Sequence, residues 1–433
     1  MNISRTHLKL GFAAFVLLAL AATALLVHRH NNPPTAFDPE SLRAYYAALQ
    51  VQPSTPVPDA AVSAAAAGAT AYIRRVIDPA GQFQYIVNMD PAVPVVQDYS
   101  ILRHQGTVFA LGSANDLAPD PANIDAMRRA VDYMRRCCYA DIPGQQVTAV
   151  REPKQVAKQS SRYYFKLGGA GLGLLALTSL ERHAPGSVPR DEMSRMSRFG
   201  QYMQNRDGSF YSLYYEKDGK RGAHNKSLYY PGEMAMGWIA MHQLAPAEDA
   251  LAAAKKALLY LSKTRWRQGS APADHWALLA TARLFQVADA EKIEIPREAL
   301  IDHTLQVCHA ILEEGRHVQP LPVMAGSLVP NGIVTPTATR LEGLQAALTY
   351  LPPNHQIVPH IRSAVDRGID FLVRAQVKEG PFAGGMPHKI TRIPDDGTEA
   401  TQKFNAEATE IRIDYVQHSL SALVQYLQRD RLP

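Results

Sequence analysis

The chain has 433 residues, of which 46% are hydrophobic and 20% are charged, as in a globular protein with one large domain or two medium ones. Its formal net charge is +5, and Arg5, Lys9 and Arg29 flank an apolar N-terminal segment, so that only +2 is left for the remainder. The sequence contains no dense stripe of Lys and Arg. These features argue against nucleic acid as a partner.

The N-terminal segment predicts attachment to a membrane. Residues 10–27 are an unbroken apolar run of 18 residues, long enough to span a bilayer, and the preceding basic residues place the N-terminus inside. Small-residue triplets at 19–21 and 22–24 are alternative cleavage sites of an export signal, but the apolar run continues beyond them. We therefore predict a signal-anchor or transmembrane segment over 1–30, with the main domain on the periplasmic or extracellular side.

Residues 31–58 are rich in proline and polar residues, which predicts a stalk with one short helix. Helical periodicity dominates after that point and continues to the end of the chain. We therefore expect a single helical domain over 59–433.

Twelve predicted helices alternate between two types. Six have a charged face, at about 59–77, 121–138, 190–205, 246–264, 296–315 and 356–377. Six are nearly uncharged after the first turn, at about 103–114, 168–181, 231–243, 274–287, 338–350 and 414–428. A helix that is apolar nearly all round is buried on all sides. The alternation therefore predicts an inner ring of six helices inside an outer ring of six.

The starts of the inner helices share an internal repeat. "RHQGTVFAL" at 103–111 aligns without gaps to "RLEGLQAAL" at 340–348, and "YVQHSLSAL" at 415–423 follows in the same frame. "YYPGEMAMG" at 229–237 shares the glycine, and 166–177 and 273–282 fit more loosely. Self-similarity at such intervals indicates that one structural unit is repeated around the fold.

A second repeat precedes the inner helices. A glycine followed by alternating aromatic and polar residues occurs at 81–88 and 208–215, and the segment 384–390 occupies the same place before the last helix. This alternation predicts short β-strands.

Six inner and six outer helices, with G-x-F strands leading into the inner ones, resemble the (α/α)6 toroid of six-hairpin glycosidases, a superfamily that also includes polysaccharide lyases and sugar epimerases. The resemblance covers 59–433 and rests on the helix starts rather than on a catalytic motif. It implies an all-α toroid with short strands at one open end, parallel inner helices, and a glycan bound where the inner helices begin.

The start of the third inner helix illustrates the chemistry expected there. Pro231 suits a first helical turn, Gly232 permits close packing, and the helix dipole favours the carboxylate of Glu233. Tyr229 and Tyr230 are placed to stack on a sugar. The alternative, that Glu233 only complements the dipole and the tyrosines belong to the core, stays open at this point.

Polar residues occupy equivalent positions at the other five starts, and burying them requires either mutual pairing or a water-filled pocket. They are Asp98, Tyr99, Arg103 and His104; Lys166; Asp274 and His275; Arg340 and Glu342; and Asp414, Gln417 and His418. Arg103 and Arg340 have a structural alternative as bidentate partners of a carboxylate such as Glu233, Glu342 or Asp414. His275 and His418 have an alternative as satisfied core residues.

A glycoside hydrolase is the first functional hypothesis, because its chemistry needs two carboxylates flanking the scissile bond. The candidate catalytic residues are Glu233, Asp274, Asp414 and Glu342. The candidate substrate-binding residues are Arg103, His104, Tyr229, Tyr230, His275, Arg340, Gln417 and His418.

Two alternatives remain. A uronate lyase or sugar epimerase would use Arg103 or Arg340 to neutralise the sugar carboxylate, and Tyr230, His104 or His418 to move a proton. A non-catalytic protein would use the same cavity to bind a glycan or to act as a scaffold in envelope assembly.

Cofactor and metal motifs are not found. The sequence lacks H-E-x-x-H, Cys-x-x-Cys and EF-hand spacings, and "GGAGLG" at 168–173 does not follow a strand of a βαβ unit, so its glycines are expected to serve helix packing. Among three cysteines, the Cys308-His309 dipeptide is a weak metal signal, and a buried structural Cys308 is favoured. We predict no metal and no cofactor; the expected partners are a glycan and the membrane, and nothing specifies a protein partner.

Overall fold

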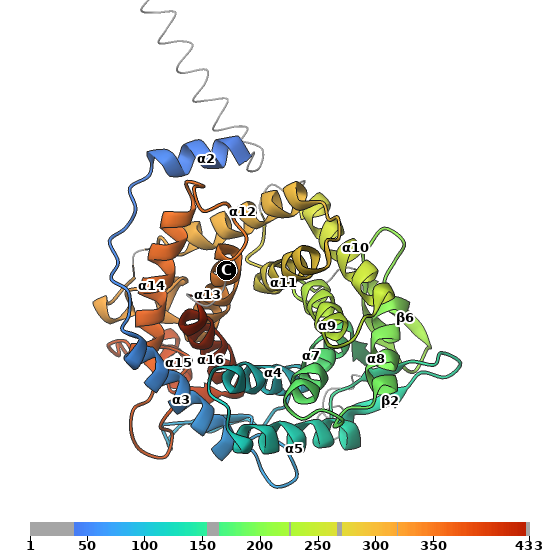
Figure 1. The fold of residues 1–433 in the computed structure, drawn as a ribbon. Helices are drawn as coiled ribbons and strands as arrows, with labels where there is room; N and C mark the ends of the chain where they lie inside the picture. The colour runs from blue at the N-terminus through green and yellow to red at the C-terminus, as the bar shows by residue number, and fades with distance from the viewer. Residues whose placement is uncertain (1–38, 154–163, 225–226, 266–270, 318, 430–433) are drawn as a thin grey trace, which may run out of the picture.

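The computed structural model describes residues 39–153, 164–224, 227–265, 271–317 and 319–429. Within these ranges the chain forms 14 α-helices and seven short β-strands (Figure 1). The predicted anchor over 1–30 lies outside the described residues. Among the helices that are described, none has the length and apolar character needed to cross a bilayer.

Six helices form the inner ring. They are α4 (Ile101–Leu117), α7 (Leu167–His183), α9 (Tyr230–Leu244), α11 (His275–Glu291), α13 (Val334–Leu348) and α16 (Ile413–Gln428). Each packs against the next in this order, and α16 packs against α4, which closes the ring (Figure 1). Most residues of these helices are buried, as expected for helices that carry almost no charge beyond the first turn.

Six further helices form the outer ring. They are α3 (Asp59–Arg75), α5 (Pro121–Cys138), α8 (Arg190–Met203), α10 (Glu248–Arg265), α12 (Arg297–Glu314) and α14 (Val358–Ala375). Each buries one apolar face against the inner ring; α5, for example, buries Met127, Val131 and Met134. The predicted two-ring arrangement is confirmed, with helix ends within a few residues of those expected.

The inner helices approach closely at glycines of the "GGAGLG" segment. A Cβ on Gly171 of α7 would meet the backbone of Glu233 and Met234 on α9, and a Cβ on Gly237 of α9 would meet the carbonyl oxygen of Gly171. Glycine is therefore required for these two backbones to touch. The prediction that these glycines serve helix packing is confirmed.

The strands lie beside the starts of the inner helices and are all antiparallel. β5 (Tyr211–Tyr215) pairs with β4 (Tyr164–Lys166) and β6 (Lys220–His224), β1 (Ile86–Asn88) pairs with β7 (Glu410–Arg412), and β2 (Tyr139–Asp141) pairs with β3 (Thr148–Val150). The strand predicted over 384–390 is reduced to isolated bridges at Pro387 and Lys389. Gly384 has a φ of +84° and Pro387 has no N–H to donate, so a regular ladder cannot run through this segment.

The repeated glycine before the strands has a structural explanation. Gly81 and Gly208 adopt φ values of +86° and +96° and lie against the backbone carbonyl of a residue on an outer helix. A side chain at either position would be strained and would clash. The turn places Phe83 and Phe210 in the core, with exposures of 3% and 1%.

Two helices lie outside the rings. Helix α2 (Pro39–Ala48) is the short helix of the predicted stalk; it buries Leu42 and Tyr46, and the Tyr46 hydroxyl lies 2.9 Å from Nδ1 of His309 on α12. This part of the predicted stalk therefore packs against the toroid. Helix α15 (Glu399–Ala408), which was not predicted, buries only Thr401 and Ala408.

The cysteines match the sequence analysis. Cys308 is fully buried in α12, in line with the structural role that was favoured for it. Cys137 and Cys138 form a disulfide between neighbouring residues at the end of α5, so the bond links no distant segments.

Candidate active site

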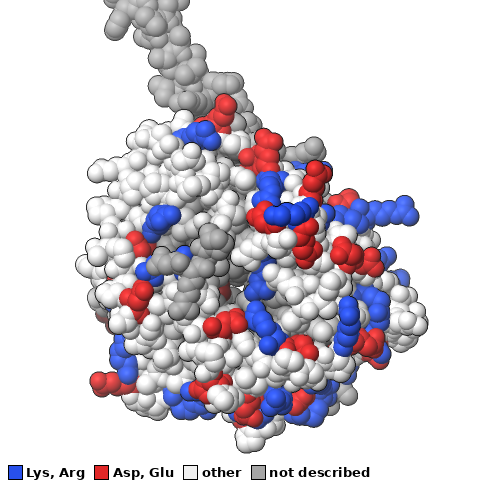
Figure 2. Space-filling view, in the orientation of Figure 1, with Lys and Arg blue, Asp and Glu red and all other residues white. Residues whose placement is uncertain are grey.

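A cavity of about 860 Å³ lies where the inner helices begin. It is lined by residues from the starts of all six inner helices, including Arg103, Lys166, Glu233, His275 and His418. The N-terminal ends of the inner helices therefore converge on one space, as the repeat at their starts predicts. Their dipoles add a positive potential there, which favours carboxylates and other anions. Figure 2 shows one face of the molecule hollowed near its centre, with charges of both signs interspersed along its lower edge.

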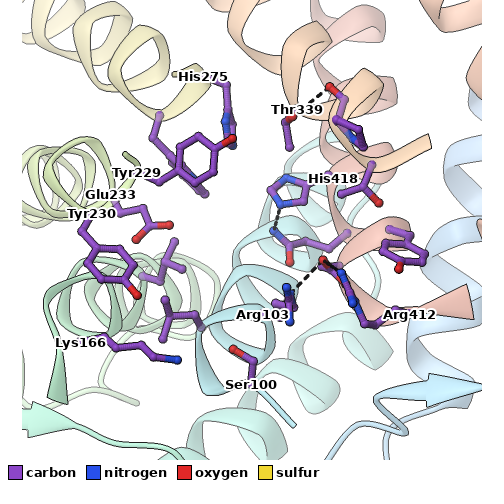
Figure 3. Close-up of a pocket in the computed structure, with 18 of the residues that line it drawn as sticks. Ser100, Arg103, Lys166, Tyr229, Tyr230, Glu233, His275, Thr339, Arg412 and His418 are labelled. Carbon is purple, nitrogen blue, oxygen red and sulfur yellow. Dashed lines mark hydrogen bonds and ion pairs between the residues drawn. The ribbon is translucent and has the colours of Figure 1, made fainter. Parts of the chain in front are cut away.

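Eight of the twelve predicted site residues line this cavity. They are Arg103, Tyr229, Tyr230, Glu233, His275, Asp414, Gln417 and His418. The close-up shows Lys166, Tyr230 and Glu233 on one side, and Arg103, Arg412 and His418 on the other (Figure 3).

Glu233 is an isolated acid in the cavity wall. It lies in the first turn of α9 and is 5% exposed, and within the described part of the chain its Oε2 has no hydrogen-bond partner. Burial, helped by the negative charge of Asp274 and opposed by Lys166, raises the pKa of Glu233 to about 8. The side chain therefore retains its proton at neutral pH and can donate it to a ligand in the cavity.

Asp414 is an ionised carboxylate in the same cavity. Its Oδ2 lies 2.9 Å from Nε of Arg103, and its Oδ1 accepts a hydrogen bond of 2.7 Å from Nε of Arg412. Burial alone would raise the pKa of Asp414, but the two guanidinium groups outweigh burial and hold the pKa below its usual value. Arg412 was missed in the sequence, although it stands only two residues before Asp414 and ends the strand that leads into α16.

Two histidines share one carboxylate at the wall of the cavity. Nδ1 of His418 lies 2.8 Å from Oε2 of Glu342, and Nε2 of His275 lies 3.8 Å from the same oxygen. Burial opposes protonation of His418, but the Glu342 carboxylate outweighs it and raises the pKa of His418. Burial, together with the charges of His418 and Arg340, holds the pKa of His275 well below its usual value. The two rings, 5.5 Å apart, therefore favour opposite protonation states.

Two predicted catalytic carboxylates stand behind the cavity wall rather than in it. Asp274 is fully buried, lies 2.7 Å from Nη2 of Arg265 and accepts a hydrogen bond from the backbone N–H of Ala277, so it caps α11. Glu342, at 2% exposure, lies behind the histidines. Neither carboxylate is among the residues that line the cavity.

Two predicted binding residues also face elsewhere. Nη2 of Arg340 lies 2.5 Å from Oε2 of Glu314 on the outer helix α12. His104 contacts the Tyr99 hydroxyl at 2.8 Å and the Ala130 carbonyl on α5 at 2.9 Å, and burial lowers its pKa to about 4. The structure thus gives Arg340 a carboxylate partner, which is the structural alternative left open for the arginines. The prediction that His104 binds the substrate is wrong, because both of its ring nitrogens have partners in the core.

The remaining wall is aromatic and polar. Lys166 donates to Glu152 at 2.6 Å, and Glu152 also accepts the backbone N–H of Ile101 at 2.7 Å, so this acid caps α4. Glu152 was not predicted because it lies on a connecting segment rather than at a helix start. Aromatic rings complete the lining, at Tyr99, Tyr164, Tyr229, Tyr230, Trp276 and Tyr415. Such a wall suits a ligand that presents both hydroxyl groups and apolar C–H faces.

No protein-family model and no curated protein sequence matches the chain. Similar solved structures do exist. An α-1,6-mannanase from Salegentibacter superposes with a TM-score of 0.54 at 8% identity, covering 86% of this chain and 100% of its own. A polysaccharide lyase superposes with a TM-score of 0.55 at 12% identity, covering 86% of this chain and 98% of its own. The cellobiose 2-epimerase of Bacillus thermoamylovorans superposes with a TM-score of 0.60 at 10% identity, covering 83% of this chain and 95% of its own.

At these identities the likeness concerns the fold: the chain is an (α/α)6 toroid of the kind that these proteins share. Inactive variants of the mannanase have been solved in complex with α-1,6-mannotriose and mannotetraose.

Proposed function

We propose that this protein is a glycan-processing enzyme of the cell envelope that hydrolyses a glycosidic bond in the cavity. The observation that carries the proposal is a pair of carboxyl groups in opposite environments. Oε2 of Glu233 is buried with no hydrogen-bond partner among the described residues, whereas Asp414 lies between Arg103 and Arg412. Burial raises the pKa of Glu233 to about 8, whereas two arginines lower the pKa of Asp414. Acid and base assignments follow from environments that push two pKa values apart.

In this proposal Glu233 donates its proton to the glycosidic oxygen as the bond to the anomeric carbon breaks. Asp414 binds Arg103 and Arg412, which lie on the other side of the cavity from Glu233 in Figure 3. It acts on the other side of the sugar, either activating water or attacking the anomeric carbon. Arg103 and Arg412 hold the Asp414 carboxylate ionised and fixed in direction. Asp274 and Glu342 are not assigned to the chemistry, because each is buried against a basic partner.

The residues of the cavity wall and the proteins of similar fold both favour a carbohydrate substrate. Tyr229 and Tyr230, at the start of α9, present rings and hydroxyls to the cavity, which suits stacking on a sugar face. Toroids of similar fold include a mannanase, a polysaccharide lyase and a sugar epimerase, and this analogy favours a carbohydrate. The apolar N-terminal run favours an envelope polysaccharide as the target.

The test is a screen of envelope polysaccharides with the purified full-length chain, with new reducing ends as the readout. Glu233→Gln should lower the rate by about 10²–10⁴-fold, because it removes a general acid while keeping the shape of the side chain. Glu291→Gln, on the outside of α11, is the matched control and should leave the rate unchanged. Equal rates in the wild type and the Glu233→Gln variant would exclude Glu233 as the proton donor.

A second candidate is epimerisation or β-elimination at a uronic acid. The observation that favours it is the histidine pair, in which His418 favours the protonated form and His275 the neutral form. Such a pair could remove a C5 proton on one side and return it on the other, while Arg103 neutralises the sugar carboxylate. This reaction would yield an inverted or unsaturated sugar, and elimination would create an ultraviolet-absorbing product that hydrolysis does not. It would depend on His418 and not on Glu233.

A further inference from the structure

We propose that His275, Glu342 and His418 bind a divalent transition-metal ion, with Zn²⁺ as the ion that this ligand set favours. The proposal goes beyond the glycosidic hydrolysis argued above, which does not require a metal. No sequence motif signals the site, because the three residues come from three different inner helices, α11, α13 and α16.

The three side chains are already gathered to nearly the spacing of a metal site. One ligand atom from each lies within 4.8 Å of the other two. The separation from Glu342 Oε2 is 2.8 Å for His418 Nδ1 and 3.8 Å for His275 Nε2. Ligand bonds of about 2.0–2.2 Å in tetrahedral geometry would separate the ligand atoms by about 3.4 Å. Small rotations of the two imidazoles are therefore enough to accommodate an ion.

The state of His275 is an independent sign of a missing ligand. Its exposure is 2%, and neither of its ring nitrogens has a hydrogen-bond partner among the residues that the structure describes. Buried polar groups are normally satisfied, and His104, equally buried, has a partner on both nitrogens. An ion bound to Nε2, the nitrogen that faces Glu342, would give His275 a partner.

The surroundings leave room for an ion and for a ligand on it. His275 and His418 line the cavity, whereas Glu342 lies behind them, so the side toward the cavity is open. Three protein ligands and one open position are typical of catalytic rather than structural zinc sites. The positive charge of Arg340 is offset by Glu314 at 2.5 Å. Two imidazoles and one carboxylate suit Zn²⁺ better than Mg²⁺ or Ca²⁺, which prefer oxygen ligands.

The test uses the purified full-length protein after chelator treatment, titrated with Zn²⁺ in a calorimeter and with Co²⁺ in a spectrophotometer. We expect one ion per chain, Co²⁺ absorption bands of a four- or five-coordinate site, and no binding of Mg²⁺. Loss of a residue that only hydrogen-bonds a metal ligand typically costs about 10–100-fold in metal affinity. Loss of a ligand itself in His275→Gln or His418→Gln should therefore cost at least about 100-fold.

His242→Gln is the matched control. The buried ring of His242 on α9 lies 3.0 Å from the exposed carboxylate of Glu291 at the end of α11. His242 belongs to no group of three possible ligands among the described residues. Its substitution should leave Zn²⁺ affinity unchanged. Zn²⁺ should also raise the melting temperature of the wild type but not of His275→Gln, and circular dichroism will show whether that variant is folded.

The proposal is overturned if the wild type binds no Zn²⁺ with one-to-one stoichiometry, or if folded His275→Gln binds it as tightly as the wild type. The Glu233→Gln variant tests metal binding separately from the proposed hydrolysis. It should lose glycan cleavage and keep full Zn²⁺ affinity, because Glu233 is not among the three ligands.

Discussion

Arg103 on α4 and Asp414 on α16 lie 2.9 Å apart, from Nε to Oδ2, so an ion pair at the cavity joins the first and last helices of the inner ring. The two residues are more than 300 positions apart in the chain. Their contact shows how ring closure turns residues from opposite ends of the sequence into one site. Asp414 is 4% exposed and depends on this partner and on Arg412 to remain charged.

Replacing Arg103 by alanine should destabilise the protein. The buried Asp414 loses one charge-assisted partner but keeps Arg412, so we expect the free energy of unfolding to fall by about 1–3 kcal/mol. Urea denaturation measures this change. The double variant Arg103→Ala/Asp414→Asn should lose less than the sum of the two single variants. Strict additivity would show that the two side chains do not interact in solution.

Replacing Glu233 by glutamine should change how stability depends on pH. Burial raises the pKa of Glu233 from 4.5 to about 8, so the folded protein keeps a proton that the unfolded chain has lost between these values. The contribution of Glu233 to stability is therefore complete below pH 4.5 and is lost as pH rises toward 8, a change on the order of a few kcal/mol. Glutamine does not titrate, so the variant should gain stability relative to the wild type across this window.

Urea denaturation at several pH values between 4 and 9 measures how the free energy of unfolding of the wild type and of Glu233→Gln depends on pH. Glu298→Gln, at an exposed position in the first turn of the outer helix α12, controls for the loss of a carboxylate elsewhere. Parallel stability curves for the wild type and Glu233→Gln would contradict a raised pKa at position 233.

The pH dependence of kcat/KM on any cleaved glycan should report the same group. A general acid with a pKa of about 8 in the free enzyme makes kcat/KM fall above that pH. The negative charge of Asp274 helps to raise the pKa of Glu233, so Asp274→Asn should move the alkaline limb to lower pH. An unchanged limb in a folded Asp274→Asn variant would argue that another group donates the proton.

Gly168 gives a steric test of the position of Glu233. A Cβ at this glycine would overlap Oε2 of Glu233 and the ring of Tyr230. Gly168→Ala should therefore displace the carboxyl group, abolish most activity and destabilise the fold by about 1–3 kcal/mol. Gly169→Ala is the control on the same helix, because the nearest atom to its Cβ would be 3.3 Å away. Similar activity in the two variants would contradict the arrangement of α7 and α9.

The rings were predictable because their signal is periodic and extends over whole helices. Inner helices such as α7 are apolar all round, whereas outer helices such as α14 carry charge on one face, and burial follows this difference directly. The prediction of a strand over 384–390 was wrong. The sequence pattern suggested a regular ladder there, but Gly384 and Pro387 interrupt it. Helix α15 was missed because it is only 10 residues long and buries only Thr401 and Ala408.

The site was predictable only in part. The repeat at the helix starts located the cavity, but the direction of each side chain depends on neighbours that are distant in sequence. Asp274 turns away because Arg265, on the outer helix α10, binds it, and Arg340 turns toward Glu314 on α12. Both partners lie near the C-terminal ends of outer helices, where no repeat drew attention to them. Glu233 lines the cavity, and no cation of the described residues forms an ion pair with it.

The most direct test of the central claim is a crystal structure of the Glu233→Gln variant with an oligosaccharide of a glycan that the wild type cleaves. The account predicts a sugar bound where the inner helices begin. Its glycosidic oxygen should lie within about 3.2 Å of the side chain at position 233, with Asp414 on the opposite side of the ring. An oligosaccharide bound on the outer surface, or in the cavity with its glycosidic oxygen far from position 233, would contradict the account.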